Sequence, residues 1–368
     1  MKYKQVNQII MAVCNKIQYD ARVIRSAETI ADLKQEVLVI SCNSNVNYNN
    51  KKFKSIVFQS KKQGHMLLIS FWFYVMKFCI KNRKKICLLY MHDYYMAIVG
   101  HIVSRLIKKD WVYDGHELLL QRKNTVMGKR EKFFFLLEKK SIKSAKLVIQ
   151  ANDERKRLVA SVYKLKNVIS IANIAPLVLT KKDRCNLLKN DIIVYQGVMS
   201  NERKVSSYIE RMKYLPVSYK LKLIGEGPDF FSYKEMVLQN SLIEKVIFTG
   251  KLPYEELVNE SKECKIGIVS YLMDDLNNYY CAPNKLYEYA QFNIPVLVSP
   301  QPFLIKIVNE YKIGEILYPN ISDREFCDLI IKMMENYNDY IVGIDKFLEK
   351  YSYEKEMFKL KDSIRKLL

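Results

Sequence analysis

Short apolar runs alternate with helix-like segments along the whole chain, and this alternation restricts the fold more than any other feature. The runs are apolar throughout, which is typical of strands in a parallel sheet that is covered by helices on both faces. In the first half they occupy residues 9–13, 36–42, 86–92, 110–116, 146–152 and 167–173. The pattern predicts an α/β fold.

The same pattern begins again after a segment that resembles a connector, residues 174–190. Its runs are residues 191–197, 219–227, 245–250, 266–271 and 295–299. We therefore expect two Rossmann-like domains, residues 1–173 and 191–350, and a C-terminal helix at residues 351–368 that crosses back to the first domain. Ligands of such sheets bind beyond the carboxyl ends of the strands, so we expect the two domains to face each other across a cleft. The alternative is two independent domains without a shared cleft.

Basic residues are concentrated in the first half of the chain. Residues 1–175 hold 33 of the 60 Lys and Arg residues but only 12 of the 39 Asp and Glu residues, which accounts for the whole net charge of +21. Basic runs at residues 51–62 and 77–85 flank a strongly apolar segment, residues 65–80. An apolar helix beside Lys and Arg clusters is typical of a protein that rests on an anionic membrane surface.

Two other interpretations of the basic half stay open. Residues 65–80 can form an ordinary helix that packs on the sheet, with its Lys residues in water. Nucleic-acid binding would also use the charge, but no recognition-helix, RNP-type or zinc motif accompanies it, so we expect no nucleic-acid partner.

The pattern of cysteines and the length of the longest apolar segment indicate the cellular compartment of the protein. The eight cysteines are scattered without a C-x-x-C pair, and no secretory signal is recognisable. We expect reduced thiols in a cytoplasmic protein. Residues 65–80 are shorter than the roughly 20 residues of a spanning helix, so we expect peripheral membrane association without a transmembrane segment.

The segment at residues 281–299 has the most specific pattern for binding. Pro283 suits the first position of a helix that continues from Asn284. The free N–H groups at such a helix end attract phosphate, and Lys285 adds a full positive charge. Glu288, one turn beyond Asn284, can accept hydrogen bonds from the two hydroxyls of a ribose. The alternative is a solvent-exposed helix whose Lys and Glu have no role.

Three other loops at strand ends are candidates for the same site. Arg203 and Lys204 follow a strand and can bind a diphosphate. Gly225 and Gly227 follow the next strand and allow a backbone to approach a ligand. Leu252 lies in a turn whose backbone groups can hydrogen-bond the edge of a base. Each loop can also be an ordinary solvated turn.

Six segments resemble, in their order, retaining GT-B glycosyltransferases of glycosyltransferase family 4. They are DARVIRSAETI (20–30), VYDGHEL (112–118), YQGVMSNERK (195–204), LIGEGPD (223–229), VIFTGKLPYEEL (246–257) and APNKLYEYAQFNIPVLVS (282–299). The resemblance covers nearly the whole chain and implies the GT-B fold.

The resemblance also implies roles for individual residues. The second domain would bind a nucleotide-diphosphate sugar and the first the acceptor. By position, Glu288 resembles the ribose-binding carboxylate, Arg203 and Lys204 the diphosphate-binding pair, and His116 the first-domain residue that faces the donor sugar. Transfer would proceed with retention, with neither metal nor cofactor, and the leaving phosphate would take the proton of the acceptor.

The chain departs from the family pattern at two positions. Tyr280 stands where the family often has a first glutamate, and Val198 stands where a basic residue usually follows the loop glycine. Asn277, Asn278 and the backbone amides of residues 281–284 can replace these contacts.

His92, which also lies at a strand end, has an alternative interpretation as a structural partner of Asp93.

These observations predict a retaining, metal-independent, hexosyltransferase-like enzyme. Its partners would be a nucleotide-sugar donor, a glycan or lipid-linked acceptor and the inner face of the plasma membrane, in surface polysaccharide biosynthesis. A nucleotide-sugar epimerase of similar fold and a non-catalytic nucleotide-sugar-binding protein are the alternatives.

Overall fold

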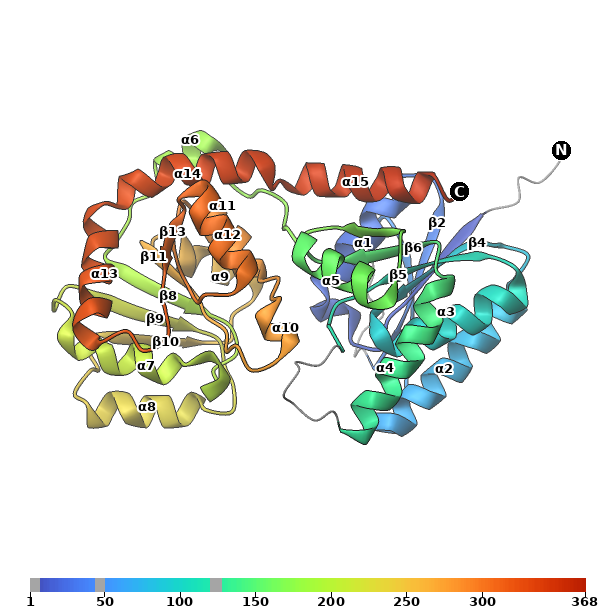
Figure 1. Ribbon diagram of the computed structural model, residues 1–368, viewed down its shortest axis with the longest axis horizontal. Coiled ribbons are helices and arrows are strands. Elements are labelled where there is room, and N and C mark those ends of the chain that lie inside the picture. The colour runs from blue at the N-terminus through green and yellow to red at the C-terminus, as the bar shows by residue number, and fades with distance from the viewer. Residues whose placement is uncertain (1–6, 44–49, 120–127) are drawn as a thin grey trace. The chain divides into compact units, whose positions relative to one another are not determined.

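The computed structural model describes residues 7–43, 50–119 and 128–368 (Figure 1). The chain divides into two compact units, Met1–Asn173 with Glu354–Leu368, and Ile174–Tyr353. Within the described residues, each unit contains one sheet whose strands all pair in parallel. The α/β prediction of two Rossmann-like domains is confirmed.

The first unit has strands in the order β3-β2-β1-β4-β5-β6-β7 among its described residues. The strands are β1 (Gln8–Ala12), β2 (Glu36–Cys42), β3 (Lys54–Phe58), β4 (Ile86–His92), β5 (Asp110–Asp114), β6 (Leu147–Gln150) and β7 (Val168–Ser170). The helices are α1 (Ala21–Ala31), α2 (Gly64–Lys81), α3 (Asp93–Ile107), α4 (Lys129–Ser141), α5 (Asp153–Tyr163) and α15 (Tyr353–Arg365).

The second unit has strands in the order β10-β9-β8-β11-β12-β13. The strands are β8 (Ile192–Gln196), β9 (Lys220–Ile224), β10 (Val246–Gly250), β11 (Ile266–Val269), β12 (Val296–Val298) and β13 (Gly314–Ile316). The helices are α6 (Lys181–Cys185), α7 (Val205–Arg211), α8 (Phe230–Gln239), α9 (Tyr254–Lys262), α10 (Leu276–Tyr279), α11 (Asn284–Gln291), α12 (Pro302–Tyr311), α13 (Asp323–Glu335) and α14 (Tyr337–Lys350).

The strand order of the second unit determines where a ligand can bind. The chain runs from β8 to β9 on one side and later returns to β11 on the other side of β8. Loops at the carboxyl ends of β8 and β11 therefore diverge, which leaves space at this edge of the sheet. One face of the sheet packs on α7, α8 and α13 in a single apolar core.

Two strands were not predicted from the sequence. β3 lies inside the basic run at residues 51–62, where the alternation of Lys with apolar residues suits a half-exposed edge strand that pairs with β2. β13 has only three residues, and its Gly314 fits because a Cβ there would lie 1.8 Å from the carbonyl oxygen of Val296. β3 was missed because it is half-exposed, and β13 because three residues carry too little apolar pattern to be recognised.

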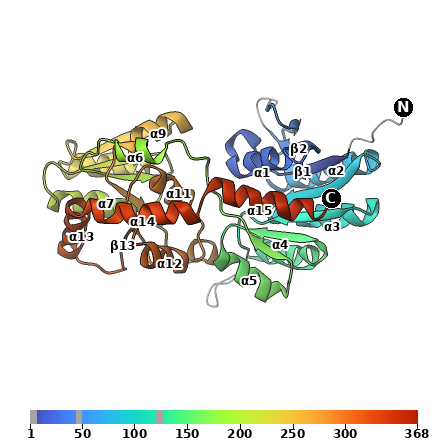
Figure 2. The same cartoon turned by 90° about the horizontal axis from the view of Figure 1, so that it is seen from above.

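The C-terminal helix α15 packs on the first unit (Figure 2). The backbone N–H of Ala172 donates to the Glu356 carboxylate at 2.6 Å, and Lys361 pairs with Asp32 at 2.7 Å. Residues 174–190 belong to the second unit and contain α6. Within the described parts of the chain, no helix is both long and apolar enough to span a lipid bilayer.

Candidate functional site

The predicted helix after residue 283 is present as α11. Pro283 is its N-cap residue, with φ −75° and ψ 124°, so the first helical residue is Asn284 and not Pro283. The Asn284 side chain is exposed, whereas Lys285 is buried and Glu288 is half-buried. The helix therefore presents its two charged residues to the interior of the second unit rather than to solvent.

Lys285 is a buried ammonium group with little compensation. Its Nζ lies 3.3 Å from the carbonyl oxygen of Gln196 and 4.3 Å from the ring centroid of Tyr195. Burial, and then the positive charge of Arg203, lower the pKa of Lys285 from 10.5 to about 7. An anion bound beside this group would favour its charged form.

Arg203 lies close to Lys285 because both contact the same aromatic ring. The guanidinium carbon of Arg203 lies 4.4 Å from the ring centroid of Tyr271, and Nζ of Lys285 lies 5.5 Å from it. Nη1 of Arg203 also donates to Oδ1 of Asn278 at 3.3 Å. Asn278, which we suggested as a replacement for a missing ligand contact, thus contacts Arg203, and its contact with a ligand stays a prediction.

Gln196 connects Lys285 to Glu288 and was missed in the sequence analysis. It is the last residue of β8; its carbonyl accepts from Lys285, and its side-chain amide donates to the Glu288 carboxylate. Its backbone N–H lies 3.1 Å from the hydroxyl of Tyr289. A polar residue at the end of a buried strand, directly before Gly197, was the signal that could have identified it.

Gly225, Gly227 and Leu252 line one cavity of about 850 Å³, together with Gly197 and Phe230. The cavity lies beyond the carboxyl ends of β8, β9 and β10. Gly197 also borders the Lys285 region, since a Cβ at Gly197 would lie 3.9 Å from Nζ of Lys285. The structure therefore gathers three of the predicted residues around one cavity and places the start of α11 next to it.

Gly225 and Gly227 have a packing role in addition to any contact with a ligand. A Cβ on Gly225 would lie 2.1 Å from the carbonyl oxygen of Gly197, and one on Gly227 would lie 2.2 Å from that of Met199. Gly225 also has φ +134°, which side chains rarely adopt. The two glycines let the loops after β8 and β9 approach each other.

We expect Gly225→Ala to destabilise the second unit by about 1–3 kcal/mol, because the new Cβ would clash with backbone and strain the residue. Urea unfolding would measure this loss. Val198→Ala is the control, since Val198 lies in the facing loop and is 55% exposed; exposed substitutions usually change stability by less than about 0.5 kcal/mol. Equal stability of the two variants would contradict the packing role.

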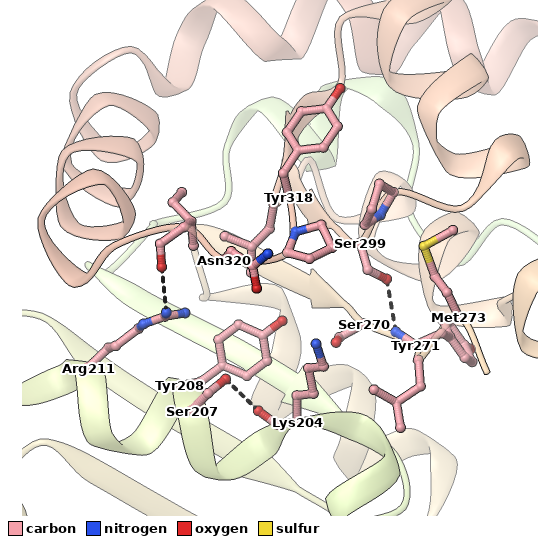
Figure 3. A pocket seen from close by; sticks show the side chains of 15 residues that line it. Lys204, Ser207, Tyr208, Arg211, Ser270, Tyr271, Met273, Ser299, Tyr318 and Asn320 are labelled. Carbon is pink, nitrogen blue, oxygen red and sulfur yellow. Dashed lines mark hydrogen bonds between the residues drawn. The ribbon is translucent and has the colours of Figure 1, made fainter.

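Lys204 is separated from the residues with which it was grouped. It has a left-handed backbone, with φ +55°, and lines a second, smaller cavity with Tyr208 and Ser270 (Figure 3). Arg203, its neighbour in sequence, instead stacks on Tyr271 beside Lys285. Tyr271 also lines this cavity, so the two residues of the predicted basic pair share one neighbour but direct their charged groups to different places.

His116 lies in the first unit, in a network that also contains His92. Nε2 of His116 is 3.1 Å from Nδ1 of His92, and the latter atom is 3.6 Å from Oδ2 of Asp114. Burial lowers the pKa of His92 to about 3 and also lowers that of His116. The interpretation of His92 as a partner of Asp93 is wrong, because β4 ends with the His92 side chain directed at His116 and Asp114.

The His92, Asp114 and His116 ligand atoms lie within 4.8 Å of one another, as in metal sites. Arg22 is bonded to one oxygen of Asp114, with Nε at 3.1 Å, and the Tyr90 hydroxyl donates to the other at 2.9 Å. Burial opposes the charge of Asp114, but Arg22 and the histidines outweigh it and lower the pKa of Asp114 to about 2. An arginine already neutralises the carboxylate, so these residues suit a hydrogen-bond network better than a cation site.

Comparison with known proteins finds a family match for the second unit. Residues 180–354 match the family model described as Glycosyl transferases group 1. No curated protein matches the chain.

Several solved structures are similar over almost the whole chain. Sucrose-phosphate synthase from Thermosynechococcus elongatus has a TM-score of 0.78 and 15% identity, covering 98% of this chain and 99% of that one. HepE from Anabaena in complex with UDP-glucose has a TM-score of 0.72 and 13% identity, covering 98% and 99%. WaaG, a glycosyltransferase involved in lipopolysaccharide biosynthesis, has a TM-score of 0.71 and 12% identity, covering 96% and 98%. These similarities show that the chain has the GT-B fold.

Proposed function

We propose that this chain, whose second unit carries a Glycosyl transferases group 1 domain, transfers a glycosyl group from a nucleotide-diphosphate sugar to a glycan or lipid-linked acceptor. One observation carries the proposal. The start of α11 holds a buried, poorly compensated ammonium group, Lys285, beside the guanidinium of Arg203, with the carboxylate of Glu288 one turn along. Two cations and one carboxylate in this order suit a diphosphate joined to a ribose.

The second unit offers a place for each part of the donor. The diphosphate would bind Lys285 and Arg203, where two charges and the amide end of α11 favour an anion. The ribose hydroxyls would donate to Glu288. The base would enter the cavity of about 850 Å³, whose lining includes Leu252 and the ring of Phe230. The HepE structure, which contains UDP-glucose on a similar fold, supports this class of donor.

The reaction would then depend on charge stabilisation. The bond between the anomeric carbon and the diphosphate breaks, and its electron pair goes to the diphosphate, where Lys285 and Arg203 stabilise the charge. The acceptor oxygen forms the new bond on the same face of the sugar, and its proton goes to the leaving phosphate. Preorganised donors of this kind each lower a barrier by roughly 2.7–4 kcal/mol. His116 is the first unit's candidate to face the sugar.

A panel of nucleotide sugars tests the proposal. We expect one of them to raise the melting temperature of the chain, because a ligand that binds only the native state stabilises it. With acceptor, that donor should release its nucleoside diphosphate, and NMR of the product should show the donor's anomeric configuration. Release of a free epimer without acceptor would identify an epimerase, and binding without turnover would identify a binding protein. An inverted product would contradict retention.

We also propose that the first unit binds the cytoplasmic face of an anionic membrane through α2. One side of α2 is buried through Leu68, Phe71, Val75 and Cys79. The opposite side exposes four apolar side chains at helical spacing, Met66, Ile69, Phe73 and Ile80. Three basic residues lie among them or directly after them, Lys77, Lys81 and Lys84. An apolar stripe with adjacent Lys residues complements an anionic bilayer surface.

We expect the chain to sediment with vesicles that contain phosphatidylglycerol and to be released by about 0.5 M salt, because salt screens the attraction. Phe73→Glu should reduce sedimentation severalfold, since it replaces a 66% exposed apolar side chain with a carboxylate. Val342→Glu on α14, where Val342 is 63% exposed, is the matched control and should bind as the wild type does. Equal binding to neutral vesicles would contradict the electrostatic part of the proposal.

A further inference from the structure

We propose that the smaller cavity of the second unit, which Lys204 lines, is a binding site for a phosphate group. The cavity has a volume of about 220 Å³ and lies beyond the carboxyl ends of β11, β12 and β13, next to α7 (Figure 3). The donor residues Lys285, Glu288, Gly225 and Gly227 do not line it among the described residues. The inference concerns the second unit alone and does not depend on glycosyl transfer.

The charge of the lining favours an anion. Among the described lining residues, Lys204 and Arg211 are basic, and none is an Asp or Glu. Arg211 is already engaged, since its Nε donates to Asp323 at 3.0 Å and its Nη2 donates to the carbonyl of Ile321 at 2.9 Å. Lys204 is therefore the cation available to a ligand.

Lys204 is held in place by its backbone while its ammonium group stays available. Its backbone N–H donates to Asn201, and its carbonyl accepts from the hydroxyl of Ser207 at 2.9 Å. Within the described residues, its ammonium group has no hydrogen bond or ion pair. Figure 3 shows the side chain directed into the cavity, toward Tyr208 and Ser270.

Neutral polar groups complete the site around the ammonium group. Tyr208 is buried, and its hydroxyl is hydrogen-bonded to Ser270. Asn320 lies in the loop that follows β13 and directs its side-chain amide into the cavity (Figure 3). One ammonium, a hydroxyl pair and an amide match the several acceptor oxygens of a phosphate group.

The size of the cavity limits the ligand. Sites for drug-sized molecules usually measure roughly 300–1,000 Å³, so this one is too small for a whole nucleotide. Two sources of the phosphate group fit, inorganic phosphate and a monosaccharide phosphate. The rings of Tyr271 and Tyr318 line the cavity and offer apolar faces for a sugar ring.

Calorimetric titration of the full chain with inorganic phosphate and with glucose 6-phosphate tests the site. We expect saturable binding of at least one of them, and tighter binding of glucose 6-phosphate would identify the sugar phosphate as the source. Lys204→Met should weaken this binding about tenfold or more. Asn320→Gly should weaken it severalfold while keeping the left-handed backbone of Asn320, which has φ +69°.

Two control variants separate this site from the donor site and from surface charge. Lys350→Met removes an exposed lysine from α14 and should leave phosphate binding unchanged. Lys285→Met should reduce UDP binding but not phosphate binding. The proposal is wrong if neither probe binds the wild type, or if Lys204→Met binds phosphate as the wild type does. It is also wrong if Lys285→Met loses phosphate binding, because the ion would then occupy the donor position.

Discussion

Lys285→Met is expected to weaken the binding of UDP, used as a donor fragment, by about ten- to a hundredfold. Hydrogen bonds to charged groups contribute roughly 1.5–3 kcal/mol, and 1.4 kcal/mol corresponds to a tenfold change in affinity. Methionine keeps the length of the side chain but removes the charge. Because the ammonium group is buried with one weak acceptor at 3.3 Å, its removal should not lower the free energy of unfolding.

The combination of lost binding and retained stability separates a ligand-binding role from a structural one. Calorimetry would measure UDP affinity, and urea unfolding would measure stability. Glu288→Gln should also weaken UDP binding tenfold or more, because an amide offers one acceptor oxygen where the carboxylate offers two. Lys350→Met is the surface control. Wild-type affinity in both Lys285→Met and Glu288→Gln would contradict the assigned site.

Donor affinity is expected to fall by about tenfold per pH unit between pH 7 and pH 9. In the free chain the pKa of Lys285 is about 7, so above pH 7 most molecules carry a neutral amine. A diphosphate stabilises the charged form, and binding at high pH must therefore take up a proton. The last ionisation of a phosphate has a pKa near 6, so the charge of UDP changes little in this range.

Titrations of the wild type and of Lys285→Met at several pH values would test this expectation. The wild type should bind UDP most tightly near or below pH 7, and the difference between the two proteins should shrink as the pH rises. Binding in buffers of different ionisation heat should show proton uptake at pH 8. A flat profile for the wild type, or an equal slope for Lys285→Met, would show that Lys285 does not bind the diphosphate.

The fold could be predicted largely because its inner strands are buried on both faces. The runs at residues 36–42 and 86–92 became β2 and β4 with the same bounds, since apolar residues fill most positions of such strands. The misses, β3 and β13, are a half-exposed edge strand and a strand of three residues. Their pairing depends on the neighbouring strand more than on their own composition.

The candidate site was predictable where one segment contains the whole pattern. Asn284, Lys285 and Glu288 follow from helix spacing, and the structure places them at the start of α11. The sequence could not show that Gln196, at the end of β8, joins Lys285 to Glu288 on α11. Gln196 and Lys285 are 89 residues apart in the chain. Contacts between distant segments depend on the register of the strands.

The basic pair shows a second limit of the sequence. Arg203 and Lys204 are adjacent, which suggested a joint role, but Arg203 stacks on Tyr271 whereas Lys204, with a left-handed backbone, lines the smaller cavity. A non-glycine residue in that conformation has no clear sequence signature. The pairing of His92 with His116 was likewise hidden, because each ends or follows a different strand and only the parallel register of β4 and β5 brings them together.

A crystal structure of the full chain with UDP tests the central claim most directly. We predict that the diphosphate lies within hydrogen-bonding distance of Nζ of Lys285, that the ribose hydroxyls donate to Glu288, and that the base enters the cavity beside Gly225. A nucleotide bound elsewhere in the second unit, with Lys285 still enclosed against Gln196 and Tyr195, would contradict the assignment.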